Sequence, residues 1–254
     1  MLLVSLVSED SMHAAQVGVT ARQEAPGSDD FYRDRGASAI MRAAHFPDEL
    51  LAFLQLELLV ARETVAGHGC DTLVELGCYD GRALEVARVA GVSYLGIDVN
   101  REGIEALKQR IFDEGLHGRA DAVHGDALKS DEWQYRIAGV NPLHVVPFNL
   151  IGNFAEPAEL LRELAKVGGI ALVSVFNAEP WTTGVRRAYY SACGIAGLME
   201  EPGRYGGVRF RGDDGFESES FGSEGFSELL AESGVKVLDE SANRYGRCIT
   251  IGLG

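Results

Sequence analysis

Two short apolar segments, separated by a glycine-containing turn and about one helix length, constrain the fold of this chain most. Residues 73–76 run into a turn that holds Gly77 and Gly81, and residues 94–97 end in Asp98. A buried strand, a glycine turn, a helix and a second strand ending in a carboxylate form the mononucleotide-binding half of a Rossmann-like sheet. The sequence therefore predicts an α/β domain with a nucleoside site where these strands end.

The spacing of the glycines indicates what kind of nucleoside fits. Tyr79 stands where a dinucleotide-binding loop has its middle glycine, so its side chain would crowd a diphosphate. The chain also has no Gly-x-x-x-x-Gly-Lys-[Ser/Thr] loop to cradle phosphates. The remaining glycines lack a Cβ and let the backbone approach a ligand closely. A nucleoside without phosphates is the better match.

Residues 75–81, Glu-Leu-Gly-Cys-Tyr-Asp-Gly, resemble motif I of the class I methyltransferases that use S-adenosyl-L-methionine. Asp98 matches the ribose-binding acid of that family, and residues 125–127, Gly-Asp-Ala, are similar to its adenine-binding turn. A Rossmann-like domain with chance glycines is the alternative. The resemblance covers residues 70–254 and implies that S-adenosyl-L-methionine is the cofactor. The cofactor-binding residues that we expect are Glu75, Gly77, Cys78, Tyr79, Gly81, Asp98, Val99, Asp126, Ala127 and Asn149.

The chain divides into three expected parts. Residues 1–30 lack periodicity and predict a flexible extension. Residues 31–68 predict an N-terminal helical lid, whose second helix is apolar on several faces and so belongs to the core or to a dimer contact. Residues 69–254 predict a doubly wound α/β sheet, Rossmann-like and mostly parallel, that closes with a C-terminal antiparallel hairpin and carries a lid hairpin at 203–222. Parallel strands are expected at 72–76, 92–98, 120–125, 144–151 and 169–176, and a long helix at 179–199.

Four residues are candidates for catalysis. Asn153 lies in Ile-Gly-Asn-Phe, which is similar to a loop of the histidine Nα-methyltransferases of ergothioneine synthesis, and this implies a contact with the substrate. A turn or helix cap is the alternative. Tyr79 and Tyr190 are aromatic candidates for holding a sulfonium, a cation without hydrogen-bond donors, with core packing as the alternative for Tyr190. Ser218 lies in the expected lid hairpin.

Composition limits the partners. The net charge of −15 argues against nucleic acid and anionic membranes as partners. Four scattered cysteines form no C-x-x-C pair, so no metal site is expected and a reduced cytoplasm is the simplest location. No histidine stands out as a general base. A small-molecule substrate is therefore expected, and a homodimer stays open.

Three functions are compatible with these features. The first is methyl transfer to an amino-acid-like or natural-product nucleophile. The second follows from a resemblance in outline to the azetidine-2-carboxylate synthases of bacterial secondary metabolism. There S-adenosyl-L-methionine cyclises on itself and releases methylthioadenosine, and Asn153, Tyr190 and Ser218 would steer its amine. The third is a binding protein without catalysis.

Overall fold

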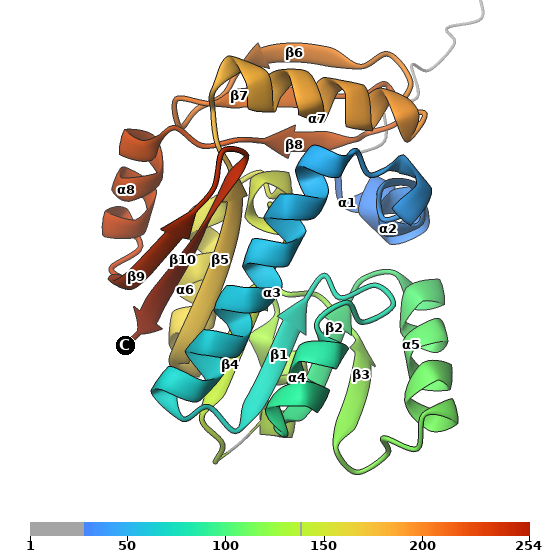
Figure 1. The fold of residues 1–254 in the computed structure, drawn as a ribbon, viewed down its shortest axis with the longest axis vertical. Helices are drawn as coiled ribbons and strands as arrows, with labels where there is room; N and C mark the ends of the chain where they lie inside the picture. Colours follow the sequence, from blue (N-terminus) through green and yellow to red (C-terminus); the bar gives the residue numbers. More distant parts are fainter. Residues whose placement is uncertain (1–27, 138) are drawn as a thin grey trace, which may run out of the picture.

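The computed structural model describes residues 28–137 and 139–254, so the expected extension at 1–30 lies almost wholly outside the described residues. Its centre is a seven-stranded sheet in the order β3-β2-β1-β4-β5-β10-β9, where β10 alone runs opposite to the other six strands (Figure 1). The prediction of a mostly parallel doubly wound sheet that ends in an antiparallel hairpin is confirmed. The strands are β1 Thr72–Leu76, β2 Ser93–Asp98, β3 Ala120–His124, β4 Pro142–Val146, β5 Gly169–Phe176, β9 Lys236–Ala242 and β10 Gly246–Leu253.

Helices cover both faces of this sheet. Alternate residues of a strand point to opposite faces, and Leu73 and Val74 of β1 accordingly belong to two different hydrophobic clusters. The first cluster includes residues of α3 Asp48–His68, α4 Leu84–Ala90 and α5 Arg101–Asp113. The second includes residues of α6 Pro157–Val167 and α8 Ser223–Glu232. It also takes in Trp133, which follows the 3-10 turn η3 Ser130–Glu132, and Ile137 from the 3-10 turn η4 Gln134–Ile137.

The N-terminal segment has two unlike parts. The first helix of the predicted lid is wrong in detail, because in its place the chain forms four short turns: α1 Ser28–Phe31, the π-helical η1 Tyr32–Gly36, α2 Ala37–Ile40 and η2 Ala43–His45. The long α3 then packs against the sheet with Leu50 and Phe53 fully buried, as a core helix does. Leu51 and Leu59 stay exposed on its outer side.

Two predicted boundaries were wrong. β4 ends at Val146 rather than at 151, because Phe148 and Asn149 turn the chain with φ values of 45° and 62° into the 3-10 turn η5 Leu150–Asn153. The helix expected at 179–199 is α7 Pro180–Ala192, which Gly194 ends with a φ of 75°. The chain then enters β6 Met199–Pro202 instead of continuing the helix.

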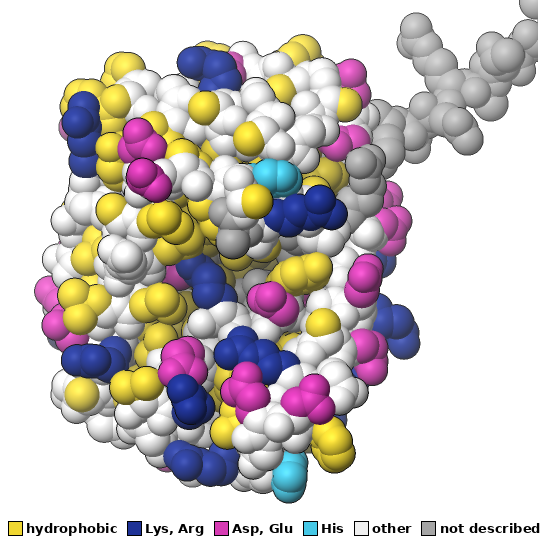
Figure 2. All heavy atoms as spheres, turned by 45° about the vertical axis from the view of Figure 1, so that its right-hand side comes forward, with side chains coloured by type: hydrophobic (Ala, Val, Ile, Leu, Met, Phe, Trp, Pro, Cys, Tyr) yellow, Lys and Arg dark blue, Asp and Glu magenta, His cyan; other side chains and the backbone are white. Residues whose placement is uncertain are grey.

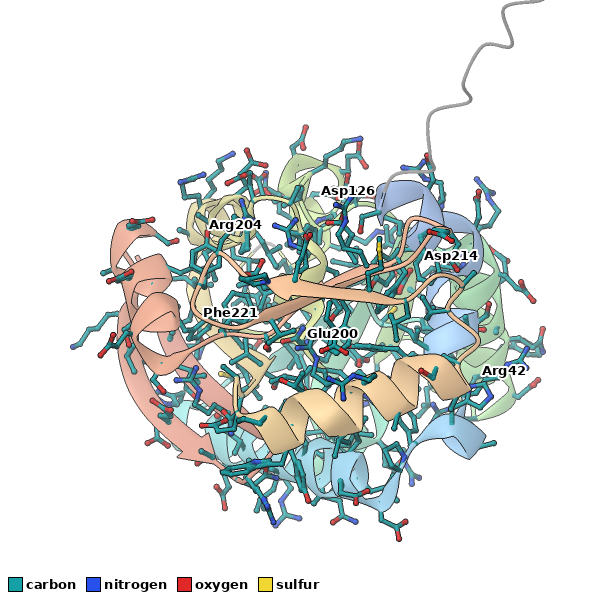
Figure 3. The ribbon with its side chains drawn as sticks, turned by 90° about the horizontal axis from the view of Figure 1, so that it is seen from above. Arg42, Asp126, Glu200, Arg204, Asp214 and Phe221 are labelled. Atoms are coloured by element: carbon teal, nitrogen blue, oxygen red, sulfur yellow. The ribbon has the colours of Figure 1, made fainter. Side chains whose placement is uncertain are left out.

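A second, three-stranded sheet lies above the carboxyl ends of the main strands (Figure 1). It consists of β6, β7 Val208–Arg211 and β8 Glu217–Glu219, all paired antiparallel, so the segment expected as a hairpin at 203–222 joins a third strand. Seen from above, α7 runs along this sheet (Figure 3). Among the described residues, no helix is both long enough and apolar enough to cross a membrane.

Candidate functional site

A pocket lies where β1, β2, β3 and β4 end, and the face that contains it is visibly hollowed (Figure 2). This is the edge at which open parallel sheets bind their ligands. Because each predicted cofactor residue lies near the carboxyl end of a strand or in the turn that follows one, the fold brings most of them to one place. Those that line the pocket are Glu75, Gly77, Cys78, Asp98, Val99, Asp126 and Ala127, and Asn153 joins them from η5.

Asp98 stands at the end of β2 with its carboxylate fixed by two backbone groups. Oδ2 accepts a hydrogen bond of 2.8 Å from the Tyr79 N–H, and Oδ1 accepts one of 2.7 Å from the Asn100 N–H. Burial raises the pKa of this carboxyl group, while the two N–H donors oppose that shift. Each oxygen keeps a lone pair free for a ligand, so the carboxylate is held ready to accept from a diol.

Glu75 occupies β1 and is buried. Its Oε2 accepts from the Ala83 N–H at 2.9 Å and from the Tyr94 hydroxyl at 2.7 Å. Oε1 has no hydrogen-bond partner among the described residues, and Glu75 belongs to the pocket wall. Burial raises the pKa of this carboxyl group to about 7, although the nearby Arg82 lowers it. Glu75 is therefore an acceptor that exchanges a proton near neutrality.

The turn after β3 is held by its own hydrogen bonds. Asp126 Oδ1 accepts from the Leu128 N–H at 2.9 Å, and the Asp126 carbonyl accepts from the buried Trp133 indole at 3.1 Å. Ala127 is buried beside them. A rigid turn with a carboxylate at the pocket wall suits recognition of a flat polar ring by an edge contact.

Tyr79 and Gly81 shape the first turn from outside the pocket lining. Tyr79 has a left-handed backbone with a φ of 45°, and its ring lies so close over Gly103 that a Cβ there would meet ring carbon Cδ2 at 2.5 Å. Its ring thus packs on the start of α5, and its N–H reaches Asp98. Gly81 has a φ of 82°, and a Cβ at this position would lie 2.5 Å from Leu107. Because Gly81 and Gly103 carry no Cβ, α5 can approach the turn closely.

Asn149 does not lie mid-strand, as the sequence had indicated, but in the turn after β4. Its Nδ2 donates to the Glu219 carbonyl at 2.9 Å and to Ser218 Oγ at 3.2 Å, while Oδ1 accepts from the Phe176 N–H at 3.0 Å. Ser218 Oγ also accepts a hydrogen bond of 2.9 Å from the Tyr190 hydroxyl. Three of the predicted site residues thus form one buried network that ties the second sheet to β4 and β5, and none of the three lines the pocket.

The centre of this network is Arg186, which the sequence analysis missed. The side chain is fully buried and donates to the Val208 carbonyl at 3.0 Å and to the Ser218 carbonyl at 2.8 Å. Its guanidinium carbon lies 4.8 Å from the Phe210 ring centroid and 5.2 Å from that of Phe176. No carboxylate among the described residues pairs with it. In the sequence Arg186 stands next to Arg187, which pairs with Glu200 on the surface, and nothing in this local pattern indicated that Arg186 is buried.

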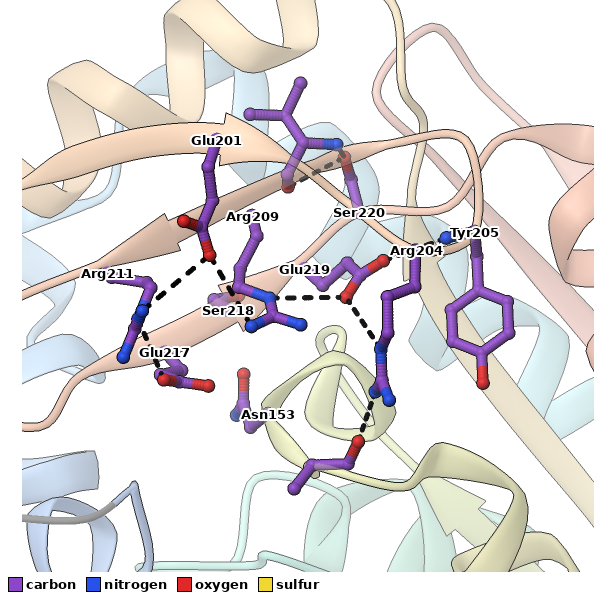
Figure 4. Close-up of polar contacts among 12 residues, drawn as sticks. Asn153, Glu201, Arg204, Tyr205, Arg209, Arg211, Glu217, Ser218, Glu219 and Ser220 are labelled. Atoms are coloured by element: carbon purple, nitrogen blue, oxygen red, sulfur yellow. Dashed lines mark hydrogen bonds and ion pairs between the residues drawn. The ribbon is translucent and has the colours of Figure 1, made fainter.

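Asn153 lies below the charged face of the second sheet (Figure 4). That face carries three arginines and three glutamates in ion pairs, for example Arg209 with Glu219 at 3.6 Å and Arg211 with Glu217 at 3.0 Å. The Asn153 carbonyl accepts from Ser28 at 3.2 Å, and Asn153 is part of the pocket wall. Glu156, and not Asn153, precedes α6 as its capping residue.

Residues 28–45 cover the pocket. Tyr32, Arg33, Ile40 and Met41 line it from this side. The Tyr32 hydroxyl donates to the Glu217 carbonyl at 2.8 Å, the Tyr189 hydroxyl donates to the Ile40 carbonyl, and the Asn100 amide donates to the Arg33 carbonyl at 3.0 Å. These few hydrogen bonds hold the segment between the second sheet and the start of α5.

The sequence matches no protein-family model and no curated protein sequence. Solved structures do match. An N-methyltransferase from Burkholderia thailandensis, with bound 1,6-didemethyltoxoflavin and S-adenosylhomocysteine, has a TM-score of 0.59 and 14% identity, over 87% of this chain and 86% of that one. An O-methyltransferase of neocarzinostatin biosynthesis, in complex with S-adenosylhomocysteine and 1,4-dihydroxy-2-naphthoic acid, has a TM-score of 0.59 and 20% identity over 88% of this chain, which spans 61% of that one.

A magnesium protoporphyrin IX methyltransferase from Synechocystis PCC 6803, with bound S-adenosylmethionine, has a TM-score of 0.57 and 12% identity, over 91% of this chain and 99% of that one. At these identities the likeness establishes architecture. The chain has the Rossmann-like fold of the S-adenosylmethionine-dependent methyltransferases, as the resemblance in the sequence implied.

Proposed function

We propose that this chain binds S-adenosyl-L-methionine in the pocket and transfers its methyl group to a small-molecule nucleophile, amino-acid-like or a natural product. The observation that carries the proposal is the Asp98 carboxylate, fixed by two N–H groups and facing the pocket at the end of β2. The three similar structures described above each contain S-adenosylmethionine or its demethylated product.

Each wall of the pocket suits one part of this ligand. Asp98 would accept from the two ribose hydroxyls, because each oxygen has a lone pair to offer. Asp126 and the backbone of Ala127 would bind the adenine edge. Glu75 would accept from the α-ammonium group through Oε1. The bound ligand supplies an electrophilic methyl carbon, and a nucleophile that attacks it leaves the bonding electron pair on sulfur.

The contribution of the protein in this proposal is positioning. Asn153 would orient the acceptor from η5, at the wall where the pocket meets the second sheet. Holding two reactants in line supplies much of the rate of such a displacement. Residues 28–45 would act as a lid that opens for entry and then excludes water, with Tyr32 as the contact to the second sheet.

The packing of Phe148 favours a second candidate, the cyclisation of S-adenosyl-L-methionine. The Phe148 ring lies at the pocket wall, and its centroid is 5.3 Å from that of Phe176, 5.6 Å from that of Phe46 and 6.0 Å from that of Tyr189. In this second candidate the packed rings limit the room for an acceptor on the Phe148 side of the pocket, whereas self-cyclisation needs no room for a second molecule. The α-amine nitrogen would bond to the side-chain carbon on sulfur, methylthioadenosine would leave with the electron pair, and the ammonium proton would pass to solvent.

One incubation separates the candidates. The purified protein is mixed with S-adenosyl-L-methionine alone, and the products are identified by mass spectrometry. Methylthioadenosine with azetidine-2-carboxylate, formed faster than without protein, would refute methyl transfer as the main reaction. Intact ligand, followed by S-adenosylhomocysteine and a methylated product once amine-bearing metabolites are added, is the result expected from our first proposal. Tight binding without turnover in either experiment would indicate a binding protein.

A further inference from the structure

Arg82 carries a buried donor that the protein itself does not use. It follows Gly81 directly and lines the pocket beside Glu75 and Cys78. Its Nη2 donates to the carboxylate of Glu57, but its Nη1 is buried and has no hydrogen-bond partner among the described residues. A buried charged donor without a partner is costly, so an acceptor is expected at this position when the site is filled.

Glu57 fixes the direction of the guanidinium. It lies on α3 with its side chain 2% exposed, and it uses both oxygens: Oε1 accepts from Arg82, and Oε2 accepts from the Phe148 N–H at 2.7 Å. The Phe148 ring lies 5.7 Å from the guanidinium carbon. Three separate segments, α3, the first turn and the turn after β4, therefore hold Arg82 in one orientation.

We propose that Arg82 binds the carboxylate of the amino-acid part of S-adenosyl-L-methionine, and that Glu57 is the positioning residue behind it. The inference rests on the proposed function. Asp98 and Asp126 take the adenosine end of the pocket, so the amino-acid end falls to the part of the wall that holds Arg82 and Glu75. A carboxylate is the acceptor that a guanidinium binds best.

With this assignment the pocket recognises both charged groups of an α-amino acid. Arg82 Nη1 offers a donor to a carboxylate, and Glu75 Oε1 offers an acceptor to an ammonium group. The site would therefore select ligands with an intact α-amino acid, such as S-adenosylhomocysteine, over methylthioadenosine, which carries the same nucleoside without the amino acid. A purely structural ion pair between Arg82 and Glu57 would give no such selection.

The test is calorimetric titration of both ligands into the full-length protein and its variants. We expect Arg82→Met to lower the affinity for S-adenosylhomocysteine by on the order of 30-fold, the effect of losing one hydrogen bond between charged groups. The affinity for methylthioadenosine should stay within about twofold of the wild-type value. Glu57→Gln should lower the affinity for S-adenosylhomocysteine by less, because the guanidinium remains but is no longer held in one orientation. Arg88→Met is the matched control, since Arg88 is exposed and forms its ion pair with Glu85 on the same helix.

Three results would overturn the inference. Equal losses for both ligands in Arg82→Met would show that Arg82 merely shapes the turn. Unchanged affinity for S-adenosylhomocysteine in that variant would show that the carboxylate binds elsewhere. If the wild-type protein binds neither ligand, the proposed function fails and the inference fails with it. Melting temperatures of each variant distinguish a local effect from unfolding, and Arg82→Lys, which keeps the charge, should recover part of the selectivity.

Discussion

Glu75 should make ligand binding dependent on pH around neutrality. In the free protein, burial raises the pKa of this carboxyl group to about 7, so it is largely protonated at pH 6. A ligand ammonium group beside Oε1 favours the ionised carboxylate and lowers that pKa. Binding therefore has to remove a proton from Glu75 whenever the pH is below 7, and the affinity should fall as the pH falls.

The size of this effect follows from the titration of one group. At one pH unit below its pKa, about one carboxyl in eleven is ionised, so the affinity for S-adenosylhomocysteine should be about tenfold lower at pH 6 than at pH 8. At pH 5.5 the loss should reach about 30-fold. Burial raises the pKa of the Tyr94 hydroxyl well above its usual range, so this hydrogen-bond partner of Glu75 should contribute little to the pH dependence.

Isothermal titration calorimetry measures both parts of the prediction. Titrations at pH 8 and pH 6 give the affinities, and repeating them in buffers of different ionisation enthalpy gives the proton count, expected to be close to one proton released at pH 6. Glu75→Gln, which keeps the shape of the side chain without its charge, should bind S-adenosylhomocysteine more weakly, and its affinity should no longer depend on pH. The same affinity at both pH values in the wild type, or the same pH dependence in the variant, would refute the reasoning.

Further predictions concern the site and the fold. Asp98→Ala should lower the affinity for S-adenosylhomocysteine by on the order of 100-fold by calorimetry, since two charge-assisted contacts to ribose are lost; unchanged affinity would contradict the ribose assignment. Arg186→Met should lower the free energy of unfolding by about 2–4 kcal/mol in urea, because the Ser218 and Val208 carbonyls lose a buried charged donor, although the Val208 carbonyl keeps the Ser220 N–H. A change below about 0.5 kcal/mol would argue against this anchor. Burial lowers the pKa of His144 to about 4 in the folded protein. As the pH drops below about 6.5, His144 therefore takes up a proton in the unfolded chain before it does so in the folded protein. The free energy of unfolding falls by about 1.4 kcal/mol for each pH unit. Glu75, whose pKa is raised in the folded protein, has the opposite effect: between about pH 4.5 and pH 7 it makes the protein more stable as the pH falls. Urea titrations at pH 5 and pH 7 test both groups. On going from pH 7 to pH 5, Glu75→Gln should lose stability relative to wild type, and His144→Gln should gain it.

The acidic residues of the pocket could be predicted because their positions are set by local sequence. Glu75 and Asp98 belong to apolar strands, and Asp126 belongs to the turn after one. Parallel strands end at one edge of a sheet, so residues at their ends meet whatever the rest of the chain does. The bounds of β1 and β5 agreed with the prediction for the same reason: each is a buried apolar run between clear turns.

The candidates for catalysis were harder to place, because their surroundings come from distant parts of the chain. Tyr190 and Ser218 are 28 positions apart and meet in a network that also takes in Asn149. Nothing in the local sequence distinguishes a hydroxyl group that faces a ligand from one that hydrogen-bonds the second sheet to the rest of the fold. The same holds for Tyr79, whose direction is set by the space above Gly103.

The sequence alone thus determined the order of the strands and helices of the main sheet and the acids at its carboxyl edge, because hydrophobic periodicity and turn residues act over short stretches of chain. Only the tertiary structure decided where the buried cations point. Arg82 is held by Glu57 from a helix 25 positions earlier, and Arg186 lies among aromatic rings and carbonyls from three strands. A charged side chain enters a protein interior only where separate segments together offer it partners, and that arrangement exists only after the chain has folded.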